Sequence, residues 1–541
     1  MNLKYILRSN DLSHSYALLL AIPLLLSFFT HFWNLTGFPG IYMDEDIYIR
    51  KALRASEGLP LEADKTNPIY GWLFLSVALK AVGYPDSLHP SADGDASSIE
   101  MLYLIPRIFI AILAIIDTFL IFKISEYHFR DRKVALIASI LFAVMPMTWL
   151  TRYVLLENIQ LPFLLSSVLF ALYLRVSGNT TNQHKIRSTL PMVLFSGICF
   201  GSAIFIKIPA FAMIPVIGFI IYTSSKSVKM LAVWFIPVLL VPLISPVYAN
   251  YLGMFTIWKD GIFYHINRGN VPFFDLTGQD PANAINALLR IDPVLLVIGI
   301  ISIIFITVRR DFLVLLWTVP YIILFYFIGY VSFYYYIPLF PALCIAFAKL
   351  TVDASNKFKN KNVKQILPFV IISGFGIFGL ISTTLLITTN INSTHFQAAA
   401  IIAHHLPNIE NSKSHEDRIT VIMGQSRFFW ILKNVFHKDH YYTTYSNVKV
   451  PINKTRGVLL IIEHDYDYWK RTDQTNRREE LLNLYNNSKT VLVLNNNTDI
   501  YDVTKYPFTS MSVWNLGIGR VELRVNTAAT NLFLDLLNHG R

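Results

Sequence analysis

Long apolar runs separated by short polar stretches dominate the first 390 residues. Eleven of these runs approach or reach the roughly 17–25 apolar residues that a membrane-spanning helix needs. They cover residues 16–33, 101–122, 134–150, 160–175, 190–206, 208–223, 230–249, 293–308, 311–328, 333–348 and 366–388. The pattern therefore predicts a polytopic α-helical membrane protein with about 11 transmembrane helices.

Two apolar stretches need separate interpretation. The run 69–83, "IYGWLFLSVALKAVG", is short and carries Lys80, so we expect a helix lying at the membrane interface. The first long run follows a basic N-terminus, but "FFTHFWNLTG" contains no small-residue cleavage site. We therefore expect a retained signal-anchor span rather than a cleaved signal peptide.

The pattern changes after residue 389 to mixed polar and apolar sequence. Three segments predict short buried strands alternating with helices: "RITVIMGQSRFFWILKN", "GVLLIIEHDYDYW" and "KTVLVLNNNTDIYDV". A tail of about 150 residues is long enough to fold alone. The predicted organisation is a transmembrane domain, residues 1–390, followed by an extracytoplasmic α/β domain, residues 391–541.

Charge orients this topology. Only 15% of the residues are charged while 54% are hydrophobic, and the net charge is +11. The excess Lys and Arg lie in short loops between the apolar runs. This distribution indicates that the positive charge sets the orientation in the membrane, by the positive-inside rule, rather than binding nucleic acid. These loops carry Lys4 and Arg8; Lys123, Arg130, Arg132 and Lys133; Arg175, Lys185 and Arg187; Lys226 and Lys229; Arg309 and Arg310; and the five lysines of "KLTVDASNKFKNKNVK", residues 349–364. We therefore predict a multi-pass plasma-membrane protein with a cytoplasmic N-terminus and with loops 34–100 and 250–292 and the C-terminal domain outside.

Charged residues gather at the predicted outer face. The first outer loop contains Asp44-Glu45-Asp46 and Tyr48, and the second contains His265 and Arg268. Arg107, Arg152, Glu157 and Lys207 lie at the outer ends of spans. A carboxylate beside several cations at the lipid–water boundary suits transfer from a phosphate-bearing lipid, because the carboxylate can accept a proton and the cations can hold the departing phosphate.

Each of these residues also has a structural interpretation. The three acids can cap and charge the start of the helix "EDIYIRKALRASEG". Arg152 and Glu157 can form a simple ion pair, and Lys207 can be an interfacial anchor. Cys199 and Cys344 lie inside apolar runs, and no His, Cys or Asp cluster has metal-ligand spacing. The sequence therefore predicts no metal site.

Several motifs, in order, resemble polytopic GT-C glycosyltransferases, in particular the protein O-mannosyltransferases and the related lipid A aminoarabinose transferases. They are "MDEDIYIRKALRASEGLP", "NPIYGWLFLSVALKAVGYP", "IPRIFIAILA", "MPMTWLTRYVLLENIQLPFLL", "GICFGSAIFIKIPAFAMIP", "FYHINRGNVPFF" and "YYYIPLFPAL". The resemblance covers most of residues 20–350. It implies a GT-C fold and transfer of a sugar from a polyprenyl-phosphate donor, with inversion and without a required metal or other cofactor.

The resemblance also implies residue roles. Asp44 would be the catalytic base, and Glu45 would support it. The matching positions for the donor are Arg152, His265, Arg268 and Tyr336, and Glu157 matches the family's acidic position. Arg107 and Lys207 are further candidates for the donor phosphate because of their place at the predicted outer face, while Tyr48 and Glu157 would shape the site or contact the acceptor.

Some positions depart from the family pattern. Ile47 and Asn67 stand where the aminoarabinose branch has Arg and Lys, and Arg50 or Lys65 are candidate replacements. These departures argue against an aminoarabinose transferase. Loop 250–292 is also too short for the β-trefoil domain of eukaryotic protein mannosyltransferases, so the acceptor stays open between protein, lipid and glycan.

The sequence thus predicts a hexosyl- or pentosyltransferase that acts on the outer face of the membrane. A transporter or lipid flippase is the main alternative, although it would need polar residues deep in several spans and an inverted repeat. A receptor with an outward sensor domain is a third. Sequons at Asn392, Asn453, Asn486 and Asn496 would face outward under this topology.

Overall fold

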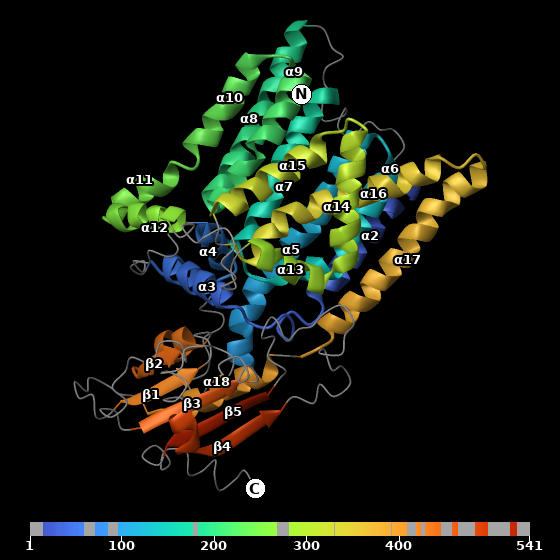
Figure 1. Ribbon diagram of the computed structural model, residues 1–541. Helices are drawn as coiled ribbons and strands as arrows, with labels where there is room; N and C mark the ends of the chain where they lie inside the picture. The colour runs from blue at the N-terminus through green and yellow to red at the C-terminus, as the bar shows by residue number, and fades with distance from the viewer. Residues whose placement is uncertain are drawn as a thin grey trace. The chain divides into compact units, whose positions relative to one another are not determined.

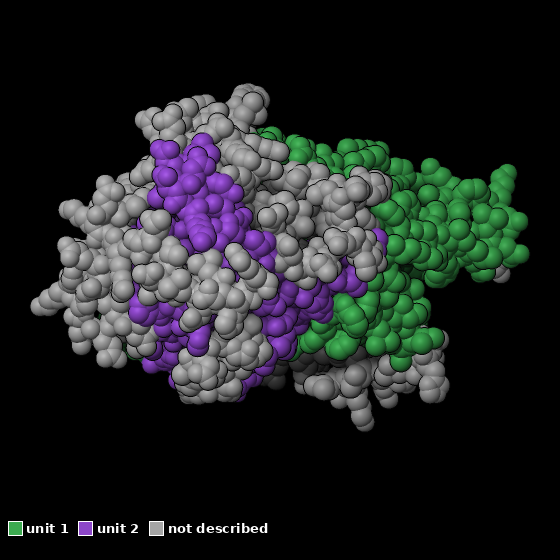
Figure 2. All heavy atoms as spheres, turned by 90° about the horizontal axis from the view of Figure 1, so that it is seen from below, with its two compact units in different colours: residues 1–33, 58–76, 109–384 green, residues 34–57, 77–108, 385–541 purple. Residues whose placement is uncertain are grey.

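The structure is a computed structural model that describes residues 14–58, 71–84, 96–176, 182–267, 281–328, 331–390, 392–407, 418–423, 428–444, 457–463, 482–495 and 520–526 (Figure 1). The chain divides into two compact units. Unit 1 comprises residues 1–33, 58–76 and 109–384, and unit 2 comprises residues 34–57, 77–108 and 385–541 (Figure 2). The predicted domain boundaries, 1–390 and 391–541, stay a prediction.

Unit 1 is helical. Its elements are α2 (His14–Phe32), α6 (Arg132–Val144), η2 (Pro146–Arg152), α7 (Leu156–Val176), α8 (Asn182–Ile206), η4 (Ile208–Met213), α9 (Ile214–Ser225), α10 (Val228–Leu240), α11 (Ile244–Tyr251), α12 (Phe255–Asn267), α13 (Pro281–Ile291), α14 (Pro293–Val308), α15 (Leu313–Ile328), η5 (Phe333–Leu339), α16 (Phe340–Asn356) and α17 (Lys361–Ile387). The division between the units falls within α4 (Trp72–Ala81), α5 (Ala96–Phe129) and α17.

The core of unit 1 forms where these helices pack face to face. Helix α7 packs on α8 and α9, α8 also packs on α10, and α16 packs on α6 and α14. Helix α16 is buried along most of its length, as its fully enclosed Phe340, Cys344 and Ile345 show. Many outward apolar side chains of α10 and α14 are exposed, as expected for helices that face lipid.

The helices coincide with the predicted spans, but their count differs. Within the described residues, seven helices are long and apolar enough to cross a membrane, or up to nine if two bent helix pairs are each one span. Tyr16–Phe32 and Leu313–Ile328 fall short, because helices of this length rise only about 25 Å. The polytopic membrane fold is confirmed, and the count of eleven is not.

Two bends interrupt predicted spans. Helix α6 meets η2 at 68°, where Pro146 follows, and α13 meets α14 at 116°. At the second bend Asp292 caps α14 by accepting the Leu295 N–H at 2.8 Å, and it also accepts the Met147 N–H at 3.2 Å. Pro146 thus marks the end of α6, and the Asp292 cap marks the start of α14.

Unit 2 contains a mixed five-stranded sheet with the order β2-β1-β3-β5-β4. Its strands are β1 (Ile419–Met423), β2 (Tyr441–Thr444), β3 (Gly457–Glu463), β4 (Ser488–Asn495) and β5 (Arg520–Asn526). β1 is parallel to β2 and β3, and β5 is antiparallel to β3 and β4. Helices α3 (Met43–Ser56) and α18 (Ser393–His405) and the π-turn η7 (Ile431–Val435) belong to the same unit.

The predicted α/β character of the tail is confirmed, with two strands that the sequence pattern missed. The three predicted strands appear as β1, β3 and β4. β2 is only four residues long, and β5 alternates charged and apolar residues in "RVELRVN". Their identity as strands depends on pairing with β1 and β3, whose buried Ile422, Val458 and Leu460 form the core of the sheet.

Candidate active site

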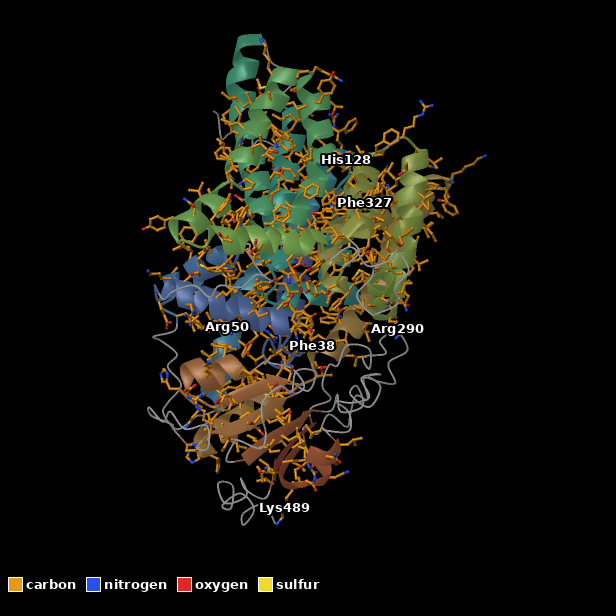
Figure 3. The ribbon with its side chains drawn as sticks, turned by 60° about the vertical axis from the view of Figure 1, so that its left-hand side comes forward. Phe38, Arg50, His128, Arg290, Phe327 and Lys489 are labelled. Carbon is orange, nitrogen blue, oxygen red and sulfur yellow. The ribbon has the colours of Figure 1, made fainter. Side chains whose placement is uncertain are left out.

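The three acids Asp44, Glu45 and Asp46, predicted to lie in an outer loop, form the first turn of α3. The helix begins at Met43, with Asp44, Glu45 and Asp46 in that turn. The Glu45 carboxylate accepts the Tyr42 N–H at 3.4 Å, so Glu45, rather than Asp46, is the acid that caps the N-terminus of α3. Negative charge here is favourable because the helix dipole places partial positive charge at the N-terminus. Figure 3 shows Phe38 in the segment before α3 and Arg50 on the helix itself.

Glu45 is also half of a buried ion pair with Arg107 of α5. Two parallel hydrogen bonds of 2.7 Å join the Arg107 Nε and Nη2 to the two carboxylate oxygens, and both side chains are fully buried. Arg107 Nη1 donates to the carbonyls of Leu35, at 2.6 Å, and Pro39, at 3.0 Å. These contacts favour a role in holding the segment before α3. The predicted role of Arg107 in phosphate binding stays a prediction.

Asp44 differs from its two neighbours in exposure. Glu45 is fully buried, and Asp46 is 4% exposed and accepts a hydrogen bond from the Tyr103 hydroxyl at 3.2 Å. Asp44 is the one acid of the three whose side chain is partly exposed. Tyr48, predicted to shape the site, is buried one turn further along α3. Of the three acids, Asp44 is therefore the one with an accessible side chain, and its role as the base stays a prediction.

In unit 1, Arg152 lies at the end of η2 and is fully buried. It donates to the Thr30 carbonyl at 2.7 Å and to the Trp33 carbonyl at 2.5 Å. These carbonyls lie at the C-terminus of α2, where the helix dipole is negative and a guanidinium is stabilised. The arrangement ties η2 to the end of α2.

Glu157 and Lys207 form a second buried ion pair, entirely within unit 1. Glu157 is in the first turn of α7, and Lys207 follows α8. The Lys207 ammonium also lies 3.9 Å from the centroid of the Tyr335 ring and 5.4 Å from that of Tyr334. A desolvated ammonium over aromatic rings gains cation–π stabilisation. The structure thus pairs Glu157 with Lys207, and the Arg152–Glu157 pair that the sequence suggested stays a prediction.

Tyr336 lies on η5 next to these aromatic residues in sequence. Its hydroxyl donates to the Pro281 carbonyl at 3.4 Å, and the side chain is 4% exposed. Its ring packs edge-on against Phe325 of α15. The predicted donor contact of Tyr336 stays a prediction.

The sequons at Asn453 and Asn496 lie outside the described residues, and so do four residues, or their side chains, named for the candidate site. Arg268, Lys65 and Asn67 lie outside the described residues, and His265 is on α12 with its side chain outside them. Among the residues that the structure does describe, no three His, Cys, Asp or Glu side chains are grouped as metal ligands. Metal independence stays a prediction.

The chain is similar to known proteins in sequence and in fold. Residues 21–259 match the family model described as dolichyl-phosphate-mannose-protein mannosyltransferase. No curated protein matches the chain in sequence.

Solved structures from Cupriavidus metallidurans and Archaeoglobus fulgidus are similar to this chain in fold. ArnT from Cupriavidus metallidurans in the apo state aligns with a TM-score of 0.55 at 11% identity, covering 96% of this chain and 99% of that one. The same protein bound to undecaprenyl phosphate aligns with a TM-score of 0.51 at 12% identity, covering 95% and 98%. The Archaeoglobus fulgidus oligosaccharyltransferase tethered with an acceptor peptide aligns with a TM-score of 0.53 at 13% identity, covering 91% and 74%.

These similarities confirm the resemblance that the ordered motifs indicated. ArnT and the archaeal oligosaccharyltransferase are both GT-C glycosyltransferases. The chain therefore has the fold of the polytopic GT-C glycosyltransferases, and its residues 21–259 carry the sequence pattern of the dolichyl-phosphate-mannose-protein mannosyltransferase family.

Proposed function

We propose that this protein is a membrane glycosyltransferase that moves a sugar from a polyprenyl-phosphate carrier to an acceptor on the outer face of the membrane. The observation that carries the proposal is the first turn of α3. There Asp44 is partly exposed beside the fully buried Glu45–Arg107 pair, inside the region that matches the mannosyltransferase family model. Two neighbours in fold are described in complex with undecaprenyl phosphate and with dolichol-phosphate, which supports a lipid-linked donor.

The proposed reaction is a single displacement at the anomeric carbon. The acceptor oxygen attacks that carbon from the face opposite the phosphate while the Asp44 carboxylate takes the hydroxyl proton. The bond between the anomeric carbon and the phosphate oxygen breaks, and its electron pair leaves with the polyprenyl phosphate. Inversion of the sugar follows from this opposite-face attack.

Cations would stabilise the charge that develops on the leaving phosphate. We assign this role to Lys207 and Arg268, with Arg152, His265 and Tyr336 as further candidates. Lys207 is held by described contacts, because its ammonium is paired with Glu157 and lies beside the rings of Tyr334 and Tyr335. Glu45 supports Asp44 through the Arg107 pair rather than by contact with substrate.

The alternative class is a transporter or lipid flippase. The family-model match over residues 21–259 favours a transferase. A flippase would move the intact lipid-linked sugar, whereas a transferase releases free polyprenyl phosphate. This difference in product separates the two classes.

Asp44→Asn tests the mechanism. We expect the variant to fold like the parent but to transfer sugar about 10²–10⁴ times more slowly, because the amide cannot accept the acceptor proton. The measurement is release of labelled mannose from dolichyl-phosphate mannose and undecaprenyl-phosphate mannose by the purified full chain, with Asp260→Asn of α12 as the matched control. Parental turnover by Asp44→Asn would refute Asp44 as the base, and movement of intact donor without release would favour a flippase.

A further inference from the structure

Asn392 occupies a buried position that its sequon does not explain. It precedes α18 and is 1% exposed. Its Nδ2 donates to the carbonyls of Thr36, at 2.6 Å, and Pro39, at 2.8 Å, while its Oδ1 accepts the Ile41 N–H at 3.2 Å. Both donors and the acceptor of this amide therefore face the segment that leads into α3.

Asn34 makes the reciprocal connection. It lies in the same segment, and its Nδ2 donates to the carbonyls of Ile387, at 2.8 Å, and Thr389, at 2.7 Å. Gly37 allows this geometry, because a Cβ at that position would collide with the Asn34 amide. The side chains of Asn34 and Asn392, one from each segment, thus join residues 34–41 to residues 387–392 within unit 2. We call this pair the asparagine clasp.

Arg107 holds the same segment from a third element. Its Nη1 binds the carbonyls of Leu35 and Pro39, so Pro39 accepts from both Arg107 and Asn392. Four backbone groups between Leu35 and Ile41 are therefore fixed by buried side chains. Asp44 follows three residues after Ile41, in the first turn of α3.

We propose that Asn392 is a positioning residue for Asp44, and that the junction between α17 and α18 is part of the catalytic scaffold. This inference rests on the proposed function, because it assigns Asn392 to the base named there. Buried, fully hydrogen-bonded amides fix backbone geometry, and a misplacement of about 1 Å can cost about 10²-fold in rate. The part of the chain after α17 thereby contributes to the proposed site through Asn392, the N-cap residue of α18.

The competing interpretation is glycosylation of the Asn392-Ser393-Thr394 sequon. The amide nitrogen that would carry a glycan is buried and bonded to two carbonyls, which excludes that modification in the folded protein. The chain offers a matched control. Thr394 is buried, and its hydroxyl has no hydrogen-bond partner within the described part of the chain, so Thr394→Val removes the sequon while keeping Asn392 and the side-chain volume.

The test compares Asn392→Ala, Asn34→Ala and Thr394→Val in the full chain, with dolichyl-phosphate mannose as the donor probe. We expect both asparagine variants to lower kcat about tenfold or more while KM for the donor changes less than about twofold. Thr394→Val should keep parental kcat. Asn34→Ala makes the test independent of whether Asn392→Ala folds well, because it breaks the clasp from the other side.

A double-mutant cycle with Asp44→Asn separates positioning from general stability. If Asn392 acts through Asp44, adding Asn392→Ala to Asp44→Asn should change the residual rate less than about twofold. Parental kcat in both asparagine variants, an equal loss in Thr394→Val, or the same fold-loss in both backgrounds would overturn the proposal. Because Asp44→Asn alone tests the base, these results can refute the clasp while the proposed function stands.

Discussion

Side-chain burial divides the three acidic residues at the start of α3 into two kinds. Glu45 and Asp46 are buried and hold Arg107 and Tyr103, whereas Asp44 is partly exposed. A carboxylate that must accept a proton from a substrate needs access, and its neighbours need rigidity. At the scale of single residues, the geometry thus separates the partly exposed Asp44, which we propose as the base, from its two buried neighbours.

The Glu45–Arg107 pair gives a prediction about stability. Arg107→Gln leaves a buried carboxylate without its cation, and breaking a buried ion pair in this way costs about 3–5 kcal/mol. We expect a clearly lower Tm for the detergent-solubilised variant. Arg418→Gln, which removes the partly exposed 2.9 Å pair with Asp439, should cost about 1 kcal/mol or less. Equal losses in both variants would contradict a structural role for Arg107.

At the scale of elements, the sheet of unit 2 depends on a buried histidine beside β2. His440 is 4% exposed and accepts the Ile419 N–H on Nδ1 at 3.2 Å, while its Nε2 lies 3.1 Å from the Pro407 carbonyl. The neutral ring satisfies both contacts by accepting on Nδ1 and donating from Nε2. His440 therefore joins the chain after α18 to the first strand.

This histidine predicts a pH dependence of folding. Burial lowers the pKa of His440 below its ordinary value, and the nearby Lys438 and Arg418 charges act in the same direction. As the pH falls, His440 therefore binds its proton at a higher pH in the unfolded chain than in the folded protein. The stabilisation is complete above about pH 6.5 and is lost as the pH falls toward the lower pKa of the folded state, by at most about 1.4 kcal/mol per pH unit.

Thermal unfolding of the full chain from pH 8 to pH 5 measures this effect. His440→Gln should flatten the decline in Tm, while His404→Gln, at an exposed position of α18, should keep it. A decline that is unchanged in His440→Gln would assign the pH dependence to another group.

At the scale of the whole molecule, the topology is a prediction that labelling can check. Asn486 lies in the C-terminal region and Asn360 between α16 and α17, and both side chains are exposed. In a chain whose Cys199 and Cys344 are replaced by Ala, Asn486→Cys should react with a membrane-impermeant maleimide in intact cells. Asn360→Cys should react only after lysis, because its loop is predicted to be cytoplasmic. The reverse labelling pattern would invert the proposed orientation.

Much of this architecture could be predicted from the sequence. Apolar runs located the helices, because a segment that spans lipid must form its backbone hydrogen bonds internally and therefore folds as a helix. Ordered motifs identified the GT-C resemblance, and the acidic stretch at residues 44–46 was placed correctly at a helix start. These features are local, so composition and spacing suffice to find them.

Other features were decided by tertiary structure. β2 and β5 are strands because their neighbours pair with them, since neither segment has a strong apolar pattern of its own. Glu157 pairs with Lys207, fifty residues away, and Asn392 binds carbonyls more than 350 residues earlier. Spacing along the chain carries no information about such contacts.

The sequence by itself determined that this is a polytopic membrane protein with a GT-C pattern and an acidic helix start after its first apolar segment. Only the tertiary structure decided which acid of that helix start is accessible and which is locked in an ion pair. The tertiary structure also decided that the Asn392 side chain is buried and hydrogen-bonded to the carbonyls of Thr36 and Pro39. The physical reason is that hydropathy acts on each segment separately, whereas burial and hydrogen-bond partners exist only once distant segments have packed together.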